Sequence, residues 1–217
     1  TNSVSVEWHV TDSAEISARV FNSECSSEWI SKLVALEYNA DLAEKSIARI
    51  WNELLLEGIR GDFAKPTVHA RNLFHSSILM YDIWAVHDDV ADTYFLGKTH
   101  NNILIEFDSF TAFKPKNESI NEAISYAMYR LISHRYSGTP GFDNLQERMM
   151  ILMQALDCDV TYDSQIYQYG NAAALGNYVA SQLIDFGLND GSREASNYDN
   201  AFYEPINLPL VLDGYGN

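Results

Sequence analysis

The chain has 217 residues, with 14 Lys and Arg against 30 Asp and Glu, so its formal net charge is -16. This excess of negative charge repels phosphate backbones and anionic lipid surfaces, which argues against nucleic-acid and membrane partners. Hydrophobic residues make up 47% of the chain, and no apolar run approaches the roughly 20 residues that a bilayer-spanning helix needs. The composition is that of a globular protein with a buried core.

Residues 1–38 are expected to hold an extended arm and a leading helix. Val4, Val6, Trp8 and Val10 alternate with polar residues, which is the period of a half-buried strand. This segment has no convincing hairpin partner nearby in the sequence. We therefore expect the arm to lie on another part of the protein or on a neighbouring copy.

Residues 39–204 carry a succession of helical patterns. Asp41 and Glu44 resemble a capping box, apolar residues at helical spacing follow over 47–59, and Gly61 suits a left-handed helix end. Pro66 fits the first position of the next helix, where its missing N–H costs nothing. That helix is apolar on most sides over 70–86, so we expect it to lie centrally in the bundle.

Three further helices are predicted in the second half of the chain. Ser119 with Glu122, and Asp143 with Gln146, mark two helix starts on either side of a Gly- and Pro-rich break at 138–141. A last helix extends over 175–186 and is expected to end near Gly187. It contains Gly176, which a close neighbouring backbone would explain. The predicted fold is an all-α bundle of five or more helices.

Residues 205–217 are predicted to form an irregular tail. The segment 205–212 is apolar and contains two prolines, so it needs to bury its side chains without forming a regular helix. We expect this tail to lead into further polypeptide, so that the chain is a fragment of a larger protein.

Arg71, His75 and Asp82 form a polar stripe on the second of these patterns, the helix that begins at Pro66. In a catalytic site His75 could transfer a proton while Asp82 orients it. The alternative, which we favour, is a hydrogen-bonded stripe that fixes the packing between helices.

Other charged groups suggest ion sites, each with a simpler explanation. His87, Asp88 and Asp92 could bind a hard cation, or the acids could be solvated after a helix end. Asp190 with Glu194 is a weaker case of the same kind. Arg130, His134 and Arg135 could hold an oxyanion or could complement a helix dipole.

The two cysteines, Cys25 and Cys158, leave a disulfide or two free thiols open. The chain lacks the His-Glu-x-x-His, Gly-x-Ser-x-Gly and Cys-x-x-Cys motifs and a phosphate-binding P-loop. We therefore assign no catalytic, cofactor-binding or metal-binding residue in this chain.

One family resemblance emerges between residues 51 and 97. It is carried by Trp51-Asn52, Ile59-Arg60, PTVHARNL at 66–73, His75, MYDIW at 80–84 and ADTYFLG at 91–97. These residues resemble the amino-terminal helices of vanadium-dependent haloperoxidase-like proteins, whose superfamily includes type-2 phosphatidic-acid phosphatases and bacterial acid phosphatases. AALGNY at 173–178 and residues 207–217 look like the same relatives.

The resemblance implies an all-helical enzyme that holds vanadate or phosphate through cationic side chains. A histidine of such an enzyme either ligates the vanadium or attacks the phosphorus. The family's Arg-Pro pair and Pro-Ser-Gly-His stretch do not occur in this sequence. The resemblance therefore implies a scaffold region, inactive alone, completed by a C-terminal catalytic half or a partner chain.

A second hypothesis is a non-catalytic helical interaction module that docks a partner chain, and a homo-oligomer is a further alternative. A third is a small metal-binding bundle built on His87, Asp88 and Asp92. The family and the start at Thr1 suggest a secreted or periplasmic location.

Overall fold

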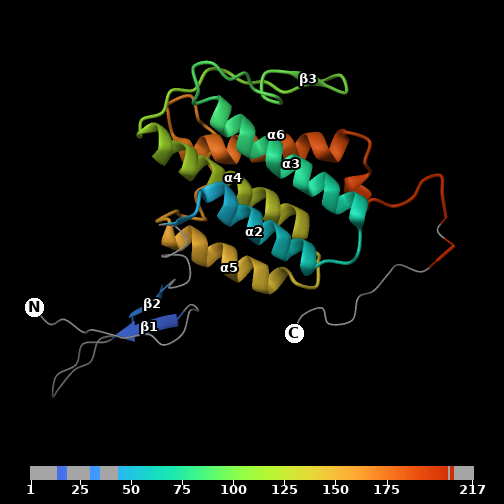
Figure 1. Cartoon of the computed structure of the whole chain (residues 1–217), viewed down its shortest axis with the longest axis horizontal. Coiled ribbons are helices and arrows are strands. Elements are labelled where there is room, and N and C mark those ends of the chain that lie inside the picture. Colours follow the sequence, from blue (N-terminus) through green and yellow to red (C-terminus); the bar gives the residue numbers. More distant parts are fainter. Residues whose placement is uncertain (1–13, 19–29, 35–43, 205, 208–217) are drawn as a thin grey trace, which may run out of the picture.

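The computed structural model describes residues 14–18, 30–34, 44–204 and 206–207. In these residues five α-helices pack into one bundle, accompanied by two short β-hairpins (Figure 1). The expected all-α class is therefore confirmed. No helix in the described part of the chain combines the length and the apolarity that crossing a bilayer requires.

The first helix whose bounds the structure describes is α2 (Ile47–Arg60). Ser46 is its N-cap, and the Ser46 hydroxyl accepts a hydrogen bond from the Arg49 N–H at 3.3 Å. Ser46, and not Asp41, therefore caps α2, and Asp41 itself lies outside the described residues. Gly61 ends the helix as predicted, but with φ of -88°, so the left-handed conformation expected there is absent.

The next helix, α3 (Pro66–Ala85), has proline at its first position, as predicted. Its expected central place in the bundle is wrong. The central helix is α4 (Lys116–Tyr136), which contacts α2, α3, α5 (Phe142–Ala155) and α6 (Ala172–Asn189). One side of α3 is exposed to solvent, although it carries large apolar side chains.

The starts of α4 and α5 also differ from the predicted capping boxes. Pro115 precedes α4, and neither helix has a side-chain cap. Ser119 lies inside α4, where it is buried, and its hydroxyl is committed to a histidine on the preceding segment. By contrast α6 has a side-chain cap, because the Asn171 amide oxygen accepts a hydrogen bond from the Ala174 N–H at 2.9 Å. This helix continues two residues past Gly187 to Asn189.

The contact between α4 and α6 explains the glycine inside α6. A Cβ atom at Gly176 would collide with the Ala123 carbonyl oxygen and lie 2.9 Å from the Tyr126 Cβ. Only glycine lets the two backbones approach this closely. The close packing that the sequence required at this position is confirmed.

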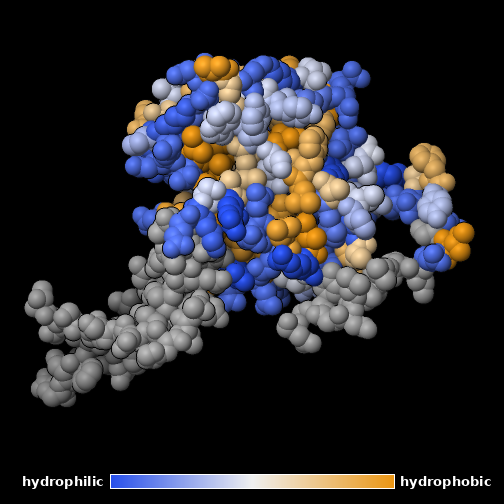
Figure 2. Space-filling view, in the orientation of Figure 1, coloured by the Kyte–Doolittle hydropathy of each residue, from blue (hydrophilic) through white to orange (hydrophobic). Residues whose placement is uncertain are grey.

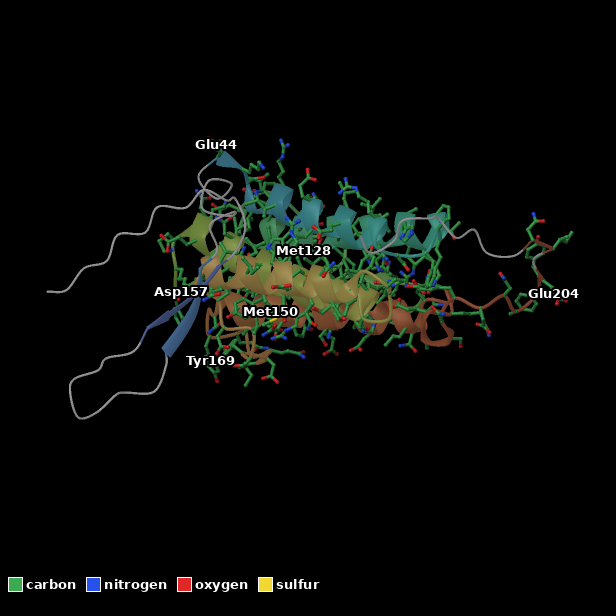
Figure 3. The ribbon with its side chains drawn as sticks, turned by 90° about the horizontal axis from the view of Figure 1, so that it is seen from below. Glu44, Met128, Met150, Asp157, Tyr169 and Glu204 are labelled. Carbon is green, nitrogen blue, oxygen red and sulfur yellow. The ribbon has the colours of Figure 1, made fainter. Side chains whose placement is uncertain are left out.

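The core fills the space around α4. Trp51 of α2 is completely buried, and its indole N–H donates a hydrogen bond to the Ser125 hydroxyl at 3.1 Å. Figure 3 shows Met128 among the helices, with Asp157 and Tyr169 at one end and Glu204 beyond the other. The largest fully buried side chains are Trp51, Tyr136, Tyr167, Phe95, Leu54, Leu55, Leu79, Ile83, Leu96, Met128, Ile132 and Leu145.

The two hairpins were not predicted. Strands β1 (Ala14–Ala18) and β2 (Ile30–Val34) are antiparallel, so the described residues of 1–38 contain no leading helix. The arm at Val4 to Val10 and the tail at 208–217 lie outside the described residues. Strands β3 (Thr99–His100) and β4 (Ile103–Leu104) are joined by Asn101 and Asn102, which both have positive φ. Asparagine tolerates that conformation, which two-residue hairpin turns require.

Candidate functional site

A buried cluster of charged residues joins α3, α4 and the end of α6. Arg71 and His75 come from α3, Arg135 from the last turn of α4, and Asp190 and Glu194 from the segment after α6; we call these five residues the Arg71–Glu194 cluster. Residues 60 to 123 positions apart thus meet in one polar site between the helices.

Glu194 holds the cluster together. One of its carboxylate oxygens accepts from Arg71 Nη2 at 3.0 Å and from Arg135 Nη1 at 2.9 Å, and the other lies 2.9 Å from His134 Nε2. Asp190 is the second carboxylate on Arg71, at 3.0 Å. Two guanidinium groups are therefore matched by two carboxylates, and the cluster is close to electrically neutral.

His75 lies between the two guanidinium groups. Arg71 Nη1 is 2.7 Å from His75 Nε2, and Arg135 Nη2 is 3.1 Å from His75 Nδ1. Burial, together with the positive charges of Arg71 and Arg135, lowers the pKa of His75 to about 3. The imidazole is thus neutral at pH 7, with a single lone pair that accepts from one of the two arginines.

The same surroundings shift the neighbouring groups. Burial raises the pKa of Glu194, but the hydrogen bond from His134 and the charges of Arg135 and Arg71 outweigh it, so the net pKa is lowered. Burial and the nearby Arg135 lower the pKa of Arg71. With each charge matched by a neighbour, the cluster is built to fix the three elements it joins.

The predicted stripe of Arg71, His75 and Asp82 divides into two sites. Arg71 and His75 contact each other and link helices, as expected. Asp82 is completely buried and has other partners: its two oxygens accept from the N–H groups of Tyr94, Phe95 and Leu96 at 2.7 to 2.9 Å. Asp82 thus fixes the turn over 94–96 and does not orient His75.

His87, Asp88 and Asp92 have separate partners. His87 contacts the Ile83 carbonyl oxygen at 2.7 Å and the Ser119 hydroxyl at 2.7 Å. Asp88 accepts from the N–H groups of the next loop residues and from a lysine of α4, and Asp92 accepts from Lys98 at 2.8 Å. Across the residues that the structure describes, no three His, Cys, Asp or Glu side chains are grouped to hold a metal ion.

The three basic residues near the end of α4 also separate. Arg130 donates to the Asn177 amide oxygen at 3.0 Å and to the carbonyl oxygens of Val160 and Tyr162. His134 and Arg135 contact Glu194 instead. The three side chains therefore do not converge on one anion, and a carboxylate of the chain already holds two of them.

Cys158 has a free thiol, and burial raises its pKa to about 11. Its Sγ lies 3.6 Å from the Leu156 carbonyl oxygen. Cys25 lies outside the described residues.

An exposed apolar surface on α3 is the main feature that sequence reasoning missed. We define the α3 apolar face as Leu73, Phe74, Ser77, Tyr81 and Trp84, which lie within an arc of about 100° on the helix. The four large side chains are 39%, 53%, 43% and 42% exposed. No member of the face is charged. Figure 2 shows apolar atoms reaching the surface on the side of the bundle where Figure 1 places α2 and α3.

Two hollows border this face. The α3 groove, of about 420 Å³, is lined by Phe74, Ser77, Ile78, Tyr81, Asp92, Thr93 and Tyr94. The α3–α6 hollow, of about 570 Å³, lies on the other side of Phe74 and Tyr94 and reaches the Arg71–Glu194 cluster. The rings of Phe74 and Tyr94 pack edge to face, 6.2 Å apart, and separate the two hollows.

Comparisons with protein-family models, with curated proteins and with solved structures find no match to this chain.

Proposed function

We propose that this chain is the helical scaffold of a vanadium haloperoxidase-like or acid-phosphatase-like enzyme, and that the α3 apolar face docks the catalytic half or partner chain. The catalytic half would supply the cationic residues that hold vanadate or phosphate. The observation that carries the proposal is the exposure of large apolar side chains along the middle of a long, well-packed helix.

The α3 apolar face has the chemistry of a docking surface. Burying apolar area contributes roughly 25 cal/mol per Å², and aromatic side chains dominate the energetics of protein interfaces. Phe74, Tyr81 and Trp84 are three such side chains on one helix face. A contiguous apolar surface of this kind on a chain with a net charge of -16 favours contact with another polypeptide over contact with water.

The Arg71–Glu194 cluster supports a scaffold role. Both arginines are paired with carboxylates of the chain, so a bound oxyanion would have to displace Glu194 or Asp190. Separating a buried ion pair costs several kcal/mol unless a new partner replaces the lost one. This supports an arrangement in which the cluster fixes α3, α4 and the end of α6, and other residues hold the anion.

The second candidate, a non-catalytic interaction module, uses the same surface. The α3 apolar face favours it equally, because docking does not depend on what the partner catalyses. The two candidates differ in one property: only the scaffold of an oxyanion enzyme belongs to an assembly that binds vanadate. A secreted or periplasmic location stays a prediction for either.

The test compares the native protein or complex containing this chain with the 217-residue chain alone. We expect vanadium NMR to show vanadate binding by the native assembly and none by the chain alone. Trp84→Glu in the assembly should separate the docked part and abolish binding. Val90→Glu is the matched control, because Val90 is exposed but lies outside the face.

A native assembly that binds neither vanadate nor phosphate would eliminate the enzyme scaffold and leave the interaction module. Vanadate binding that survives Trp84→Glu as well as Val90→Glu would contradict docking through α3.

A further inference from the structure

We propose that Glu194 blocks a binding site for a small carboxylic acid. Arg71, His134 and Arg135 form this site, and the Glu194 carboxylate occupies it from the segment 191–199, which we call the strap. A carboxylate from outside the chain can take the place of Glu194 and release the strap. The inference does not rest on the proposed function, because all the groups that form the site belong to this chain.

Three basic side chains converge on the Glu194 carboxylate. Arg71 and Arg135 contact the same oxygen, at 3.0 and 2.9 Å, and His134 Nε2 lies 2.9 Å from the other. These side chains come from α3 and from the last turn of α4, two long helices of the bundle. Arg71 is also held by Asp190, and the Arg135 side chain is only 3% exposed. The three groups are therefore fixed by contacts other than those with Glu194.

The strap has a backbone conformation that its own residues disfavour. Glu194 begins a single 3₁₀ turn, η1 (Glu194–Ser196), and Arg193 and Tyr198 on either side of this turn have φ of 61° and 58°. Residues with a Cβ atom rarely adopt such angles, which persist where surrounding contacts impose them. Here Glu194 and the Tyr198 hydroxyl, which accepts from Arg135 Nη1 at 3.2 Å, tie the strap to the helices. Releasing the strap would relieve this strain.

A hollow beside the strap leads to Glu194. It has a volume of about 410 Å³, and Lys65, His134, Arg135, Glu194 and Tyr198 are among the residues that line it. This volume is within the usual range for small-molecule sites. The His134 side chain is 34% exposed, so solvent reaches the contact between His134 and Glu194. A small acid can thus approach the site without separation of the helices, and Lys65 adds a positive charge to the wall.

Charge and geometry select the class of ligand. With Glu194 withdrawn, Arg71 and Arg135 would share one carboxylate, that of Asp190, and Asp62 would be the acid left in the wall of the hollow. The emptied site would therefore attract an anion, and another carboxylate has the geometry that restores each lost contact. A small acid brings one negative charge, whereas an acidic partner chain would be repelled by a chain of net charge -16.

The first test empties the site in the full chain. Thermal unfolding of Glu194→Ala is measured at pH 7 in sodium acetate and in sodium chloride of the same ionic strength. We expect acetate at a tenfold excess over its Kd to raise the midpoint by about 3 to 6 °C relative to chloride, because acetate replaces the missing carboxylate. Glu122→Ala is the control, since Glu122 pairs with Lys114, whose side chain is 55% exposed. Acetate should stabilise this control no more than chloride does.

The second test measures displacement in the wild type. Backbone amide NMR follows Ala195 and Ser196, two exposed residues of the strap, during titration with the same two salts. We expect their signals to shift with acetate until they reach saturation, and to ignore chloride. Because acetate competes here with a tethered carboxylate, half-saturation should need at least about tenfold more acetate than in Glu194→Ala. This titration decides the case in which Glu194→Ala stays unfolded in both salts.

The proposal is overturned if acetate stabilises folded Glu194→Ala no more than chloride does, or if acetate leaves the Ala195 and Ser196 signals of the wild type unchanged. A capped tripeptide with one central glutamate that binds more tightly than acetate would assign the site to a partner chain and overturn the small-acid ligand. Failure of Trp84→Glu to separate a docked catalytic half would leave these results unaffected, because Trp84 is not part of the site.

Discussion

The buried imidazole of His75 should make the stability of this protein sensitive to mild acid. The pKa of His75 falls from an ordinary 6.5 to about 3 on folding, because the ring is buried between Arg71 and Arg135. Below pH 6.5 the unfolded chain takes up a proton at His75 that the folded chain does not accept. The stabilisation is therefore complete above pH 6.5 and decreases as the pH falls. At pH 5 the loss from this one group is about 2 kcal/mol, at about 1.4 kcal/mol per pH unit.

Replacing His75 by glutamine isolates this contribution, because an amide does not titrate. Urea unfolding followed by tryptophan fluorescence gives the free energy of unfolding at pH 7 and pH 5. We expect the decrease between these values to be about 2 kcal/mol smaller in His75→Gln than in the wild type.

Ile83→Val is the control for stability loss without titration, because it removes one methyl group from a fully buried side chain. It should cost about 0.5 to 1.5 kcal/mol at both pH values. An equal decrease in the wild type and in His75→Gln would show that His75 is not held neutral by its surroundings.

Three other predictions concern the groups that fix the bundle. Glu194→Gln should lower the free energy of unfolding in urea by about 3 to 5 kcal/mol, since it removes a carboxylate from two buried arginines. An unchanged unfolding midpoint would refute the role of Glu194. Because the pKa of Glu194 is lowered in the folded chain, its contribution to stability is complete above the pKa of an ordinary glutamate and is lost as the pH falls through the folded pKa. Gly176→Ala should lower the free energy of unfolding by about 1 to 3 kcal/mol, because its Cβ would collide with the Ala123 carbonyl oxygen. Gly138→Ala is the control and should be tolerated, since a Cβ there meets nothing within 4 Å. Equal thermal midpoints in the two variants would contradict the tight α4–α6 contact. Asp82→Asn should speed backbone hydrogen exchange at Phe95 and Leu96. The asparagine side chain offers only one acceptor oxygen to the three backbone N–H groups that the carboxylate binds. Unchanged exchange would rule out Asp82 as the support of the turn over 94–96.

Local signals in the sequence predicted local structure well. Pro66 at the start of α3 and the break at 138–141 follow from backbone geometry, which depends on a few neighbouring residues. The glycine inside α6 correctly indicated a close backbone contact, although not its partner. Capping boxes were less informative, because Ser119 matches the pattern and yet uses its hydroxyl to contact His87.

The candidate sites depend on long-range contacts, which the sequence pattern did not contain. Arg71 and Glu194 are 123 positions apart, and nothing near either residue marks the other as its partner. Asp82 shares a helix stripe with His75, but the turn at 94–96 captures its carboxylate. The apolarity of α3 on most sides suggested a central helix, because the sequence pattern alone does not distinguish a buried apolar side from an exposed one.

Solvent accessibility of the α3 apolar face in the native assembly tests the central claim most directly. Oxidative footprinting with mass spectrometry would compare Tyr81 and Trp84 in the 217-residue chain and in the native protein or complex that contains it, with the exposed Tyr169 as an internal reference. Docking through α3 predicts that Tyr81 and Trp84 react in the isolated chain and are protected in the assembly, while Tyr169 reacts in both. Equal reactivity of Tyr81 and Trp84 in the two samples would contradict the proposal that α3 docks a catalytic half or partner chain.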